Sequence, residues 1–390
     1  MNIDYANIQD WQEELYKDLH RNPELSFEET RTAGIIEEQL AGFGYGVQRI
    51  GGGVVGVLKN GDGPVVLFRA DIDGLPVEED SGLDYASEKP GVMHACGHDS
   101  HIACALGAAR ILSERRDGWA GTHIALFQPA EETGSGARAM VQDGLVDKVP
   151  KPDVALGQHV MPGAAGTVSL CAGAAMSQAV SMKVTVFGKG SHGSMPHLGV
   201  DPVVLASSIV LRLQTVVSRE LAPSEFGVIT VGSLHAGAKS NVIPDRAELL
   251  LNIRTYSADV HERIIAAVER IVRGECAAAG SPTEPTFEQY DHFPLTDNDE
   301  AATARVKAAF TSHFGTEKVL DMEPSTGSED FSNIPDAWGV PYLYWIFGGF
   351  DADAAPIPNH NPKFAPIMQP TLQTGTEAAV VGMLEYLGKR

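Results

Sequence analysis

The first 180 residues alternate between helical and strand patterns of apolar positions. Residues 5–42 keep a helical period that stops at Gly42 and Gly44, and two β-branched runs flank the turn-rich tetrapeptide 60–63. The first pattern predicts a helical region and the second a β-hairpin. The predicted elements are a helical region at 5–42, hairpin strands at 54–59 and 65–69, a helix at 102–116 with Asp99 or Ser100 available as N-cap, and strands at 122–127 and 153–157.

A different alternation of strands and helices begins at residue 181. Asp201, with Pro202 at the first helical position, predicts the start of one helix, and a second helix has an apolar stripe over 264–272. Strands are predicted at 183–187, around 229, at 249–255 and at 342–347. A chain of 390 residues exceeds what one hydrophobic core usually organises. We therefore expect an α/β protein whose discontinuous first domain, 1–179 with 289–390, is interrupted by a second domain at 180–288.

The chain is strongly acidic, with 51 Asp and Glu against 29 Lys and Arg and a formal net charge of -22. Such a surface repels phosphate backbones and anionic membranes, so we expect no nucleic-acid partner. No apolar run reaches the ~20 residues needed to span a bilayer, and we expect no membrane association. Four cysteines do not form a disulfide framework in a chain of this length, which indicates a reducing, cytoplasmic compartment.

Several common motifs of catalysis and nucleotide binding are absent or out of context. Two matches to G-x-G-x-x-G, at 51–56 and 188–193, do not lead directly from a strand into a helix. Neither therefore offers the helix N-terminus that binds a pyrophosphate. The sequence contains no G-x-S-x-G elbow, no Walker sequence and no H-E-x-x-H. Dinucleotide binding, serine hydrolysis and zincin chemistry have little support.

The segment 94–101 concentrates groups that bind metal ions, because it holds three imidazoles, a thiol and a carboxylate. A solvated surface cluster is the alternative, but the segment is small, contains glycine and borders an apolar helix. In an extended chain, alternation directs His94, Cys96 and His98 to one side, where two of them can meet a metal ion. A metal site is the favoured interpretation.

Glu131 and Glu132 follow the predicted strand 122–127. Adjacent acids are usually a solvated pair, but strand ends carry ligand sites in open α/β sheets. One carboxylate can bind a metal while the other takes a proton from the attacking water, as amide hydrolysis requires. His159 and His360 are individually weak candidates, although each follows a strand or lies in a loop where ligands occur.

Five motifs occur in order along nearly the whole chain. They are Arg69-Ala70-Asp71-Ile72-Asp73-Gly74-Leu75-Pro76, His94-Ala95-Cys96-Gly97-His98-Asp99, Gln128-Pro129-Ala130-Glu131-Glu132, Gly190-Ser191-His192-Gly193 with Pro196-His197, and Gly327-Ser328-Glu329-Asp330 with Asn359-His360. This order resembles the aminoacylase, hippurate hydrolase and indole-acetyl-amino-acid hydrolase family of two-metal metallopeptidases, and within it the N-acyl-glutamine aminoacylases of actinobacteria. The resemblance implies a catalytic α/β domain with a central mixed sheet and a two-metal site, interrupted by a smaller α/β lid domain that mediates dimerisation.

The resemblance also implies roles for individual residues. The implied metal ligands are Cys96 as the bridge, His98 and His159 on the metals, Glu132 on one metal and His360 on the other. Two divalent ions per subunit are implied, and a thiolate ligand suits zinc, although related enzymes work with manganese, cobalt or nickel. Glu131 matches the general base. Asp71 matches an aspartate that orients a metal-binding histidine two residues earlier, but Arg69 stands there and His98 is expected to supply the imidazole.

Three residues of the implied lid match positions that act on the substrate. His192 matches a residue that reaches the partner subunit's active site in a homodimer and stabilises the tetrahedral oxyanion. Asn241 and Arg254 match positions that bind the substrate's carboxylate or amide, for which a guanidinium fork is suited. The alternative for Arg254 is an ordinary arginine on a strand surface.

The leading functional prediction is hydrolysis of the amide bond of N-acyl amino acids, which gives a carboxylic acid and a free amino acid. One alternative is a metallo-dipeptidase or carboxypeptidase, which would cleave unblocked dipeptides rather than acetyl-amino acids. Another is a non-catalytic binding protein on the same scaffold, against which the intact Glu131 and ligand set argue.

Overall fold

The computed structural model describes residues 3–353 and 355–389, which form two compact units. Unit 1 consists of Met1–Ala175, Thr296–Pro324 and Asp330–Arg390, and unit 2 of Met176–Leu295 and Ser325–Glu329. Each unit has its own apolar core, which includes Trp345 in unit 1 and Leu249 in unit 2. Separate cores are what a chain of this length requires.

Unit 1 is built on a mixed sheet of eight strands. In spatial order they are β1 (Gly46–Ile50), β2 (Gly53–Asn60), β4 (Gly121–Gln128), β3 (Val65–Asp71), β5 (Val154–Ala164), β16 (Tyr342–Phe350), β6 (Val168–Leu170) and β15 (Val319–Asp321). β3 runs parallel to β4 and β5, whereas β1, β2 and β4 pair antiparallel. Every residue of β4 is buried, as expected for a strand covered on both faces. The α/β class with a mixed sheet is confirmed.

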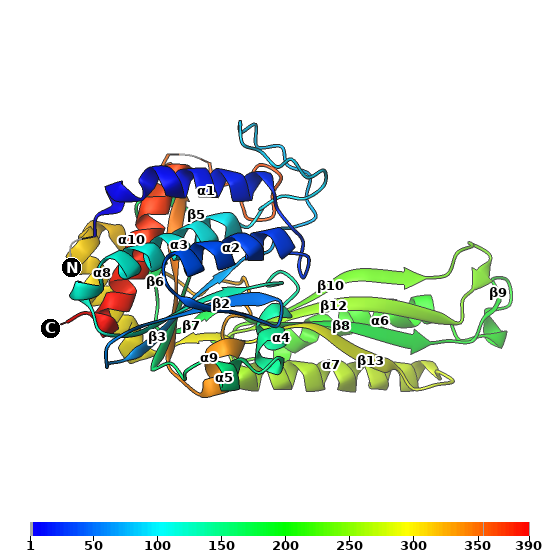
Figure 1. Ribbon diagram of the computed structural model, residues 1–390. Helices are drawn as coiled ribbons and strands as arrows, with labels where there is room; N and C mark the ends of the chain where they lie inside the picture. Colours follow the sequence, from blue (N-terminus) through cyan, green and yellow to red (C-terminus); the bar gives the residue numbers. More distant parts are fainter. Residues whose placement is uncertain (1–2, 354, 390) are drawn as a thin grey trace. The chain divides into compact units, whose positions relative to one another are not determined.

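Helices cover both faces of this sheet. They are α1 (Gln9–Arg21), α2 (Thr30–Gly42), α3 (His98–Glu114), α4 (Gly136–Gln142), α5 (Leu145–Lys148), α8 (Glu300–Phe314), α9 (Asn333–Trp338) and α10 (Met368–Leu387). Figure 1 shows α1, α2 and α3 on one side of β2 and β3, with α5 and α9 on the other. In the part of the chain that the structure describes, no helix is long and apolar enough to cross a membrane.

The prediction of a hairpin from the runs at 54–59 and 65–69 is wrong. β2 and β3 contain these runs, but β4 lies between them and pairs with both. A turn sequence makes two strands close in the chain, yet it does not prevent a distant strand from inserting between them. The hairpin that forms is β1 with β2, through Gly51 and Gly52 at φ of 56° and 90°. Glycine adopts such angles without steric cost, which suits a two-residue turn.

Two helix predictions also need correction. The region 5–42 is three helices, the 3-10 turn Tyr5–Asn7, α1 and α2, because Asn22 before Pro23 leaves the helical conformation. The helix expected at 102–116 begins earlier, at His98, and its N-cap is Gly97 rather than Asp99 or Ser100. His98 therefore lies on the first turn of α3 rather than on a loop before it.

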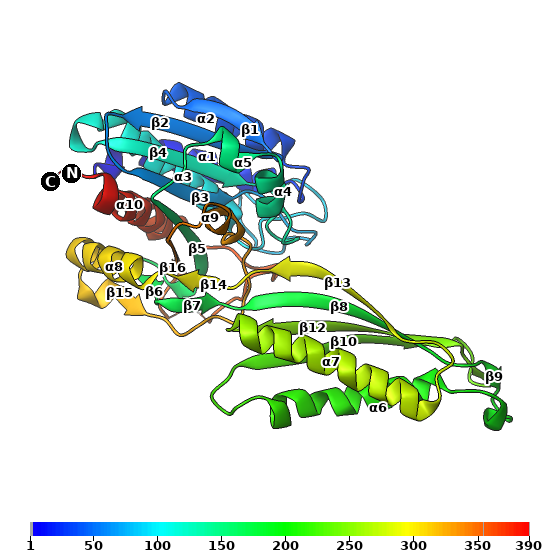
Figure 2. The ribbon, with the colours of Figure 1, turned by 90° about the horizontal axis from the view of Figure 1, so that it is seen from below.

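Unit 2 is a four-stranded antiparallel sheet with two helices against it. The strands in spatial order are β10 (Gly227–Ala236), β12 (Arg246–Thr255), β8 (Gln178–Phe187) and β13 (Thr286–Phe293). The helices α6 (Pro202–Thr215) and α7 (Ala258–Ala279) both pack on it and lie side by side in Figure 2. Asp201 caps α6 as predicted, with its Oδ1 accepting from the Val203 N–H at 2.8 Å. The short strands β9 (Ser191–His192) and β11 (Val242–Ile243) pair beyond this sheet.

Candidate metal and active site

The candidate site gathers at the ends of parallel strands in unit 1. Asp71 ends β3, Gln128 ends β4, and the two residues are paired in the strand register. His159 lies on β5, which runs parallel to β3. Carboxyl ends of parallel strands share one edge of a sheet, so these segments bring their polar side chains together.

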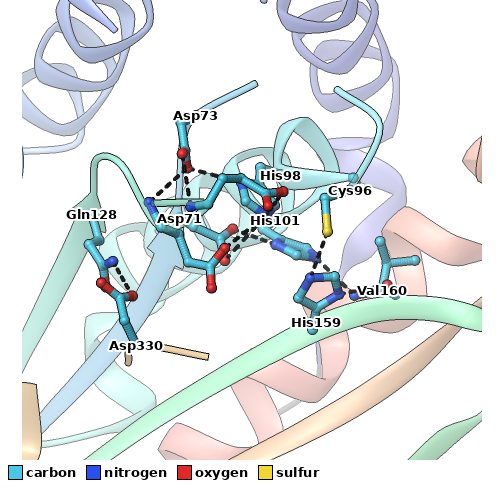
Figure 3. A network of polar contacts seen from close by, with 12 residues as sticks. Asp71, Asp73, Cys96, His98, His101, Gln128, His159, Val160 and Asp330 are labelled. Atoms are coloured by element: carbon cyan, nitrogen blue, oxygen red, sulfur yellow. Dashed lines mark hydrogen bonds and ion pairs between the residues drawn. The ribbon is translucent and has the colours of Figure 1, made fainter. Parts of the chain in front are cut away.

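Cys96 and His98 enter this edge from the start of α3. Gly97 between them has φ of 83°, and a Cβ on it would lie 2.3 Å from Val160 Cγ1. Only glycine fits there, and the turn at Gly97 brings both flanking side chains into the site. Both side chains are buried, and the Cys96 Sγ lies 3.4 Å from the Nε2 of His159 (Figure 3).

Hydrogen bonds orient two of the imidazoles so that each presents its Nε2. The Nδ1 of His98 lies 3.2 Å from Asp73 Oδ1, and the Nδ1 of His159 lies 2.7 Å from the Val160 carbonyl oxygen. A carboxylate and a carbonyl can only accept, so each Nδ1 carries the proton and donates it. Each Nε2 then keeps its lone pair, which is the arrangement of a metal-binding histidine.

The Nε2 of His98 is buried and hydrogen-bonded to no described group, although oxygens of three carboxylates surround it. Asp71 Oδ2 and Glu132 Oε1 each lie 3.8 Å away, and Glu131 Oε2 lies 4.0 Å away. Burial lowers the pKa of His98, but Asp71, Asp73 and Cys96 together raise it well above its ordinary value. A lone pair that faces carboxylates requires a positive charge between them, either a proton or a cation.

A second group of donors includes the same thiol. Cys96, Glu132 and His360 place one donor atom each within 4.8 Å of one another, and the Glu132 Oε2 is 3.3 Å from the His360 Nε2. The pKa of His360 is raised to about 10 by hydrogen bonding to Cys96 and Glu132. The expectation that Glu132 and His360 serve different metals stays a prediction, although their facing donor atoms favour a shared one.

The donor set fits two cations. Cys96, His98 and His159 form one group within 4.8 Å, and Cys96 is also a member of the group with Glu132 and His360. Burial holds the pKa of His159 well below its ordinary value, so this imidazole is neutral and able to bind a metal. A thiol shared by two groups is the position from which a thiolate bridges two ions.

His94 does not join either group, contrary to the alternation expected for an extended segment. The chain is not extended there: it turns over 94–97, where the Gly97 N–H donates to the His94 carbonyl oxygen at 3.3 Å, and α3 starts at His98. The His94 ring is buried, and neither ring nitrogen is hydrogen-bonded to a described residue. Burial lowers its pKa to about 4, so the ring is neutral.

Asp71 contacts a different histidine from the one expected. Its Oδ1 accepts from His101 Nδ1 at 2.5 Å (Figure 3), and its Oδ2 accepts from Arg69 Nη1 at 2.7 Å. The Nε2 of His101 accepts from the Val160 N–H at 2.8 Å, so His101 has no lone pair left for a metal. Asp71 therefore holds His101 against β5, although it also lies 3.8 Å from His98.

A buried polar network extends from Arg69, at the position where the resemblance implied a histidine. Arg69 donates from Nε to Gln128 Oε1 at 2.9 Å, and Gln128 donates to Asp330 Oδ1 at 2.5 Å. Asp330 Oδ2 in turn accepts from the Ala137 N–H near the start of α4 at 3.1 Å. Burial opposes ionisation of Asp71, but His98, His101 and Arg69 hold its pKa well below the ordinary value. The fixed positive charge of the guanidinium thus offsets the negative charge of the carboxylates at this edge of the sheet.

Sequence reasoning missed the roles of Asp73 and His101. Asp73 lies in the motif 69–76, two residues after Asp71, and His101 lies in the histidine-rich segment 94–101, so the proximity of both residues to the site was detectable. Their contacts were not predictable, because Asp73 follows the end of β3, where strand alternation no longer applies.

The three lid residues singled out from the sequence lie in unit 2. His192 is exposed on β9 with its Nδ1 2.7 Å from Ser194 Oγ, and the Gly193 N–H donates to the exposed Asn241 at 2.8 Å. Arg254 is on β12, where its Nη1 donates to the Thr326 carbonyl oxygen at 2.6 Å. His192 and Asn241 are thus neighbours, whereas Arg254 lies at the opposite end of the unit 2 sheet.

An α/β fold on a mixed sheet, with a thiol shared by two groups of metal donors, is the arrangement of a binuclear metallohydrolase. The model of peptidase family M20/M25/M40 matches residues 67–381, and the chain belongs to this family.

Individual relatives agree with this membership. The chain is 39% identical over 342 residues to N-acetyl-L-cysteine deacetylase of Bacillus subtilis strain 168, covering 86% of this chain and 79% of that protein. It is 34% identical over 394 residues to thermostable carboxypeptidase 2 of Saccharolobus solfataricus, covering 99% and 98%. The solved structure of the Bacillus subtilis YXEP protein, a dinuclear metal-binding M20 peptidase, matches with a TM-score of 0.81, 28% identity and coverage of 97% and 99%.

Proposed function

We propose that this protein is a metal-dependent amidohydrolase that cleaves N-acyl amino acids into a carboxylic acid and a free amino acid. The observation that carries the proposal is the buried thiol of Cys96, shared by two groups of metal donors, with the Glu131 carboxylate beside them. The relationship to an N-acetyl-L-cysteine deacetylase supports the acyl amino acid as substrate.

Five residues would hold the two ions. We assign Cys96, His98 and His159 to one ion and Cys96, Glu132 and His360 to the other, because these donors lie together. When bound, divalent cations make a water molecule more acidic and polarise the scissile carbonyl. A thiolate with imidazole and carboxylate suits zinc, with manganese, cobalt and nickel as the other candidates.

Glu131 is our candidate for the general base. Its carboxylate lies 4.0 Å from His98 Nε2, and its side chain is only 8% exposed, so few waters compete for it. Its backbone N–H is held by Asp73 Oδ1 at 3.1 Å, which fixes where the side chain starts. A carboxylate so placed can accept the proton of the attacking water and return it to the leaving nitrogen.

We propose that residues 1–179 and 289–390 form the catalytic domain and that 180–288 form a lid through which two chains dimerise. Of the twelve large apolar side chains that are exposed among the described residues, ten lie in unit 2, including Val204, Leu211 and Val242. Exposed apolar side chains concentrated on one unit are typical of an interaction surface. The edge strand β10 adds unpaired backbone groups to that unit.

The geometry of unit 2 supports an active site completed by a partner chain. β12 runs from Arg246, near the β9 end of the sheet, to Arg254 at the other end. Eight residues at roughly 3.3 Å each separate these ends by about 26 Å. Since an N-acyl amino acid is much shorter, His192 and Arg254 of one chain cannot both bind it, and we assign His192 to the partner's substrate.

A carboxypeptidase is the second candidate, because the relationship to thermostable carboxypeptidase 2 extends over 99% of this chain. The deciding experiment loads the purified protein with zinc or manganese and compares acetyl-, benzoyl- and longer-chain acyl-amino acids with unblocked dipeptides. Faster cleavage of acyl amino acids is the expected result. Cleavage of unblocked dipeptides alone would favour a peptidase, and fewer than one bound metal per chain with no turnover would favour a binding protein. The cytoplasmic location stays a prediction.

A further inference from the structure

Asp73 is buried at the centre of the candidate site and belongs to neither group of ligands. Its Oδ1 accepts from His98 Nδ1 at 3.2 Å and from the Glu131 N–H at 3.1 Å. Its Oδ2 accepts from the Glu132 N–H at 3.1 Å and from the Ser26 hydroxyl at 2.7 Å. Four donors thus meet one carboxylate, and Figure 3 shows it facing His98 and the neighbouring backbone.

The loop that Asp73 holds has a backbone conformation that needs support. Ala130, just before Glu131, has φ of 48°, which a residue with a side chain rarely adopts. The Ala130 N–H donates to Glu29 Oε1 at 2.8 Å, so three consecutive N–H groups of this loop end on two buried carboxylates. Consecutive N–H groups around a left-handed residue form a concave site for an anion. Here the protein itself supplies the anion.

We propose that Asp73 is a positioning residue that couples the position of the metal ligand His98 to that of Glu131 and Glu132. Through His98 Nδ1 it directs one imidazole Nε2 at a metal, and through two backbone N–H groups it places Glu131 and Glu132. One carboxylate therefore sets the relative position of a metal ligand on α3 and of the base and ligand after β4. This inference extends the proposed function, but its metal-binding arm is independent of the substrate.

The test substitution is Asp73→Asn, which conserves size. An amide keeps one accepting oxygen and replaces the other by a donating NH2, so one pair of donors loses its acceptor whichever way the group turns. The Ser26 hydroxyl can rotate to accept from the NH2, but the Glu132 N–H cannot. We therefore expect the amide NH2 to take the place of Oδ2. In that orientation the hydrogen bond to His98 is kept, and the Glu132 N–H loses its acceptor.

Co²⁺ is the probe, because it reports both affinity, by chelator competition, and thiolate coordination, by absorption. Loss of a group that orients a metal ligand typically weakens metal binding ~10- to 100-fold, and we expect this for Asp73→Asn because the ligand Glu132 loses the acceptor of its backbone N–H. At saturating Co²⁺ we expect kcat to fall at least tenfold with KM within threefold, because Glu131 directly precedes the released Glu132 and shifts with it, while substrate contacts remain. Ser26→Ala is the matched control, since it removes one donor and keeps the carboxylate, and it should stay within threefold of wild type in both measurements.

Several results would overturn the proposal. Wild-type Co²⁺ affinity and kcat in Asp73→Asn, or a lower melting temperature with unchanged affinity, would show that Asp73 is merely structural. If Asp73→Asn does not fold, Asp73→Glu keeps the charge but displaces both oxygens, and wild-type affinity in that variant would refute the coupling. A wild-type protein that binds two Co²⁺ ions but hydrolyses no acyl amino acid would defeat the proposed function and leave the Co²⁺ test of Asp73 valid.

Discussion

Complementation between two inactive variants tests the composite active site most directly. His192→Ala removes the proposed oxyanion donor, and Glu131→Gln removes the proposed base while keeping side-chain size. Loss of one oxyanion donor typically costs ~10²- to 10³-fold in kcat, so each variant alone should be nearly inactive. Metal content should be unchanged in His192→Ala, because this exposed ring lies on β9 in unit 2, whereas all five proposed ligands belong to unit 1.

The expected recovery follows from the assignment of the two residues to different chains. Each site would use Glu131 of its own chain and His192 of the partner, as the proposed composite site requires. Random reassortment of equal amounts makes roughly half of the dimers mixed, and each mixed dimer has one intact site of two. Activity should therefore approach about a quarter of the wild-type value.

The assay mixes the two proteins after reversible dissociation and follows hydrolysis of an acyl amino acid. Light scattering confirms the dimer, and differently tagged chains confirm that subunits exchange. His192→Ala mixed with His192→Ala is the matched control and should stay at background. If subunits exchange while activity remains at the background of the single variants, His192 does not act across the dimer, and the composite site must be abandoned.

Three further predictions address the ligands, the base and the stability of the fold. Glu131→Gln should retain both metals and lose ~10²- to 10⁴-fold in kcat, and a loss below tenfold would refute the base. Cys96→Ser should lower both metal content and activity, because a neutral hydroxyl replaces a shared thiolate; full occupancy by elemental analysis would contradict the bridge. His20 lies 2.6 Å from Asp99 and 3.1 Å from Glu79, and although burial opposes its charge these carboxylates raise its pKa to about 9. Since this pKa is raised above the unfolded value of roughly 6.5, the stabilisation is complete below that pH and is lost as the pH rises through 9. The apparent free energy of unfolding should follow this trend in the wild type and lose it in His20→Asn.

Much of the secondary structure was predictable because its causes are local. Asp201 with Pro202 marks the start of α6, and the apolar stripe of α7 is buried at Ile264, Val268 and Ile271. These patterns depend on the period of the helix and on capping, which neighbouring residues determine. Strand order is not local, and the hairpin failed because β4, more than fifty residues further along the chain, pairs between β2 and β3.

The residue types of the candidate site were largely predictable from the sequence, whereas their contacts were not. The order of the motifs identified the family and the candidate residues Cys96, His98, Glu131 and Glu132, because the proposed hydrolysis needs such groups whatever their surroundings. Only the tertiary structure showed that Glu132 lies against His360 and that His94 belongs to neither donor group. It also showed that Asp73 accepts hydrogen bonds from two backbone N–H groups. The physical reason is that such contacts join segments far apart in the chain, and the direction of each side chain there depends on a backbone that only the assembled sheet and α3 hold in place.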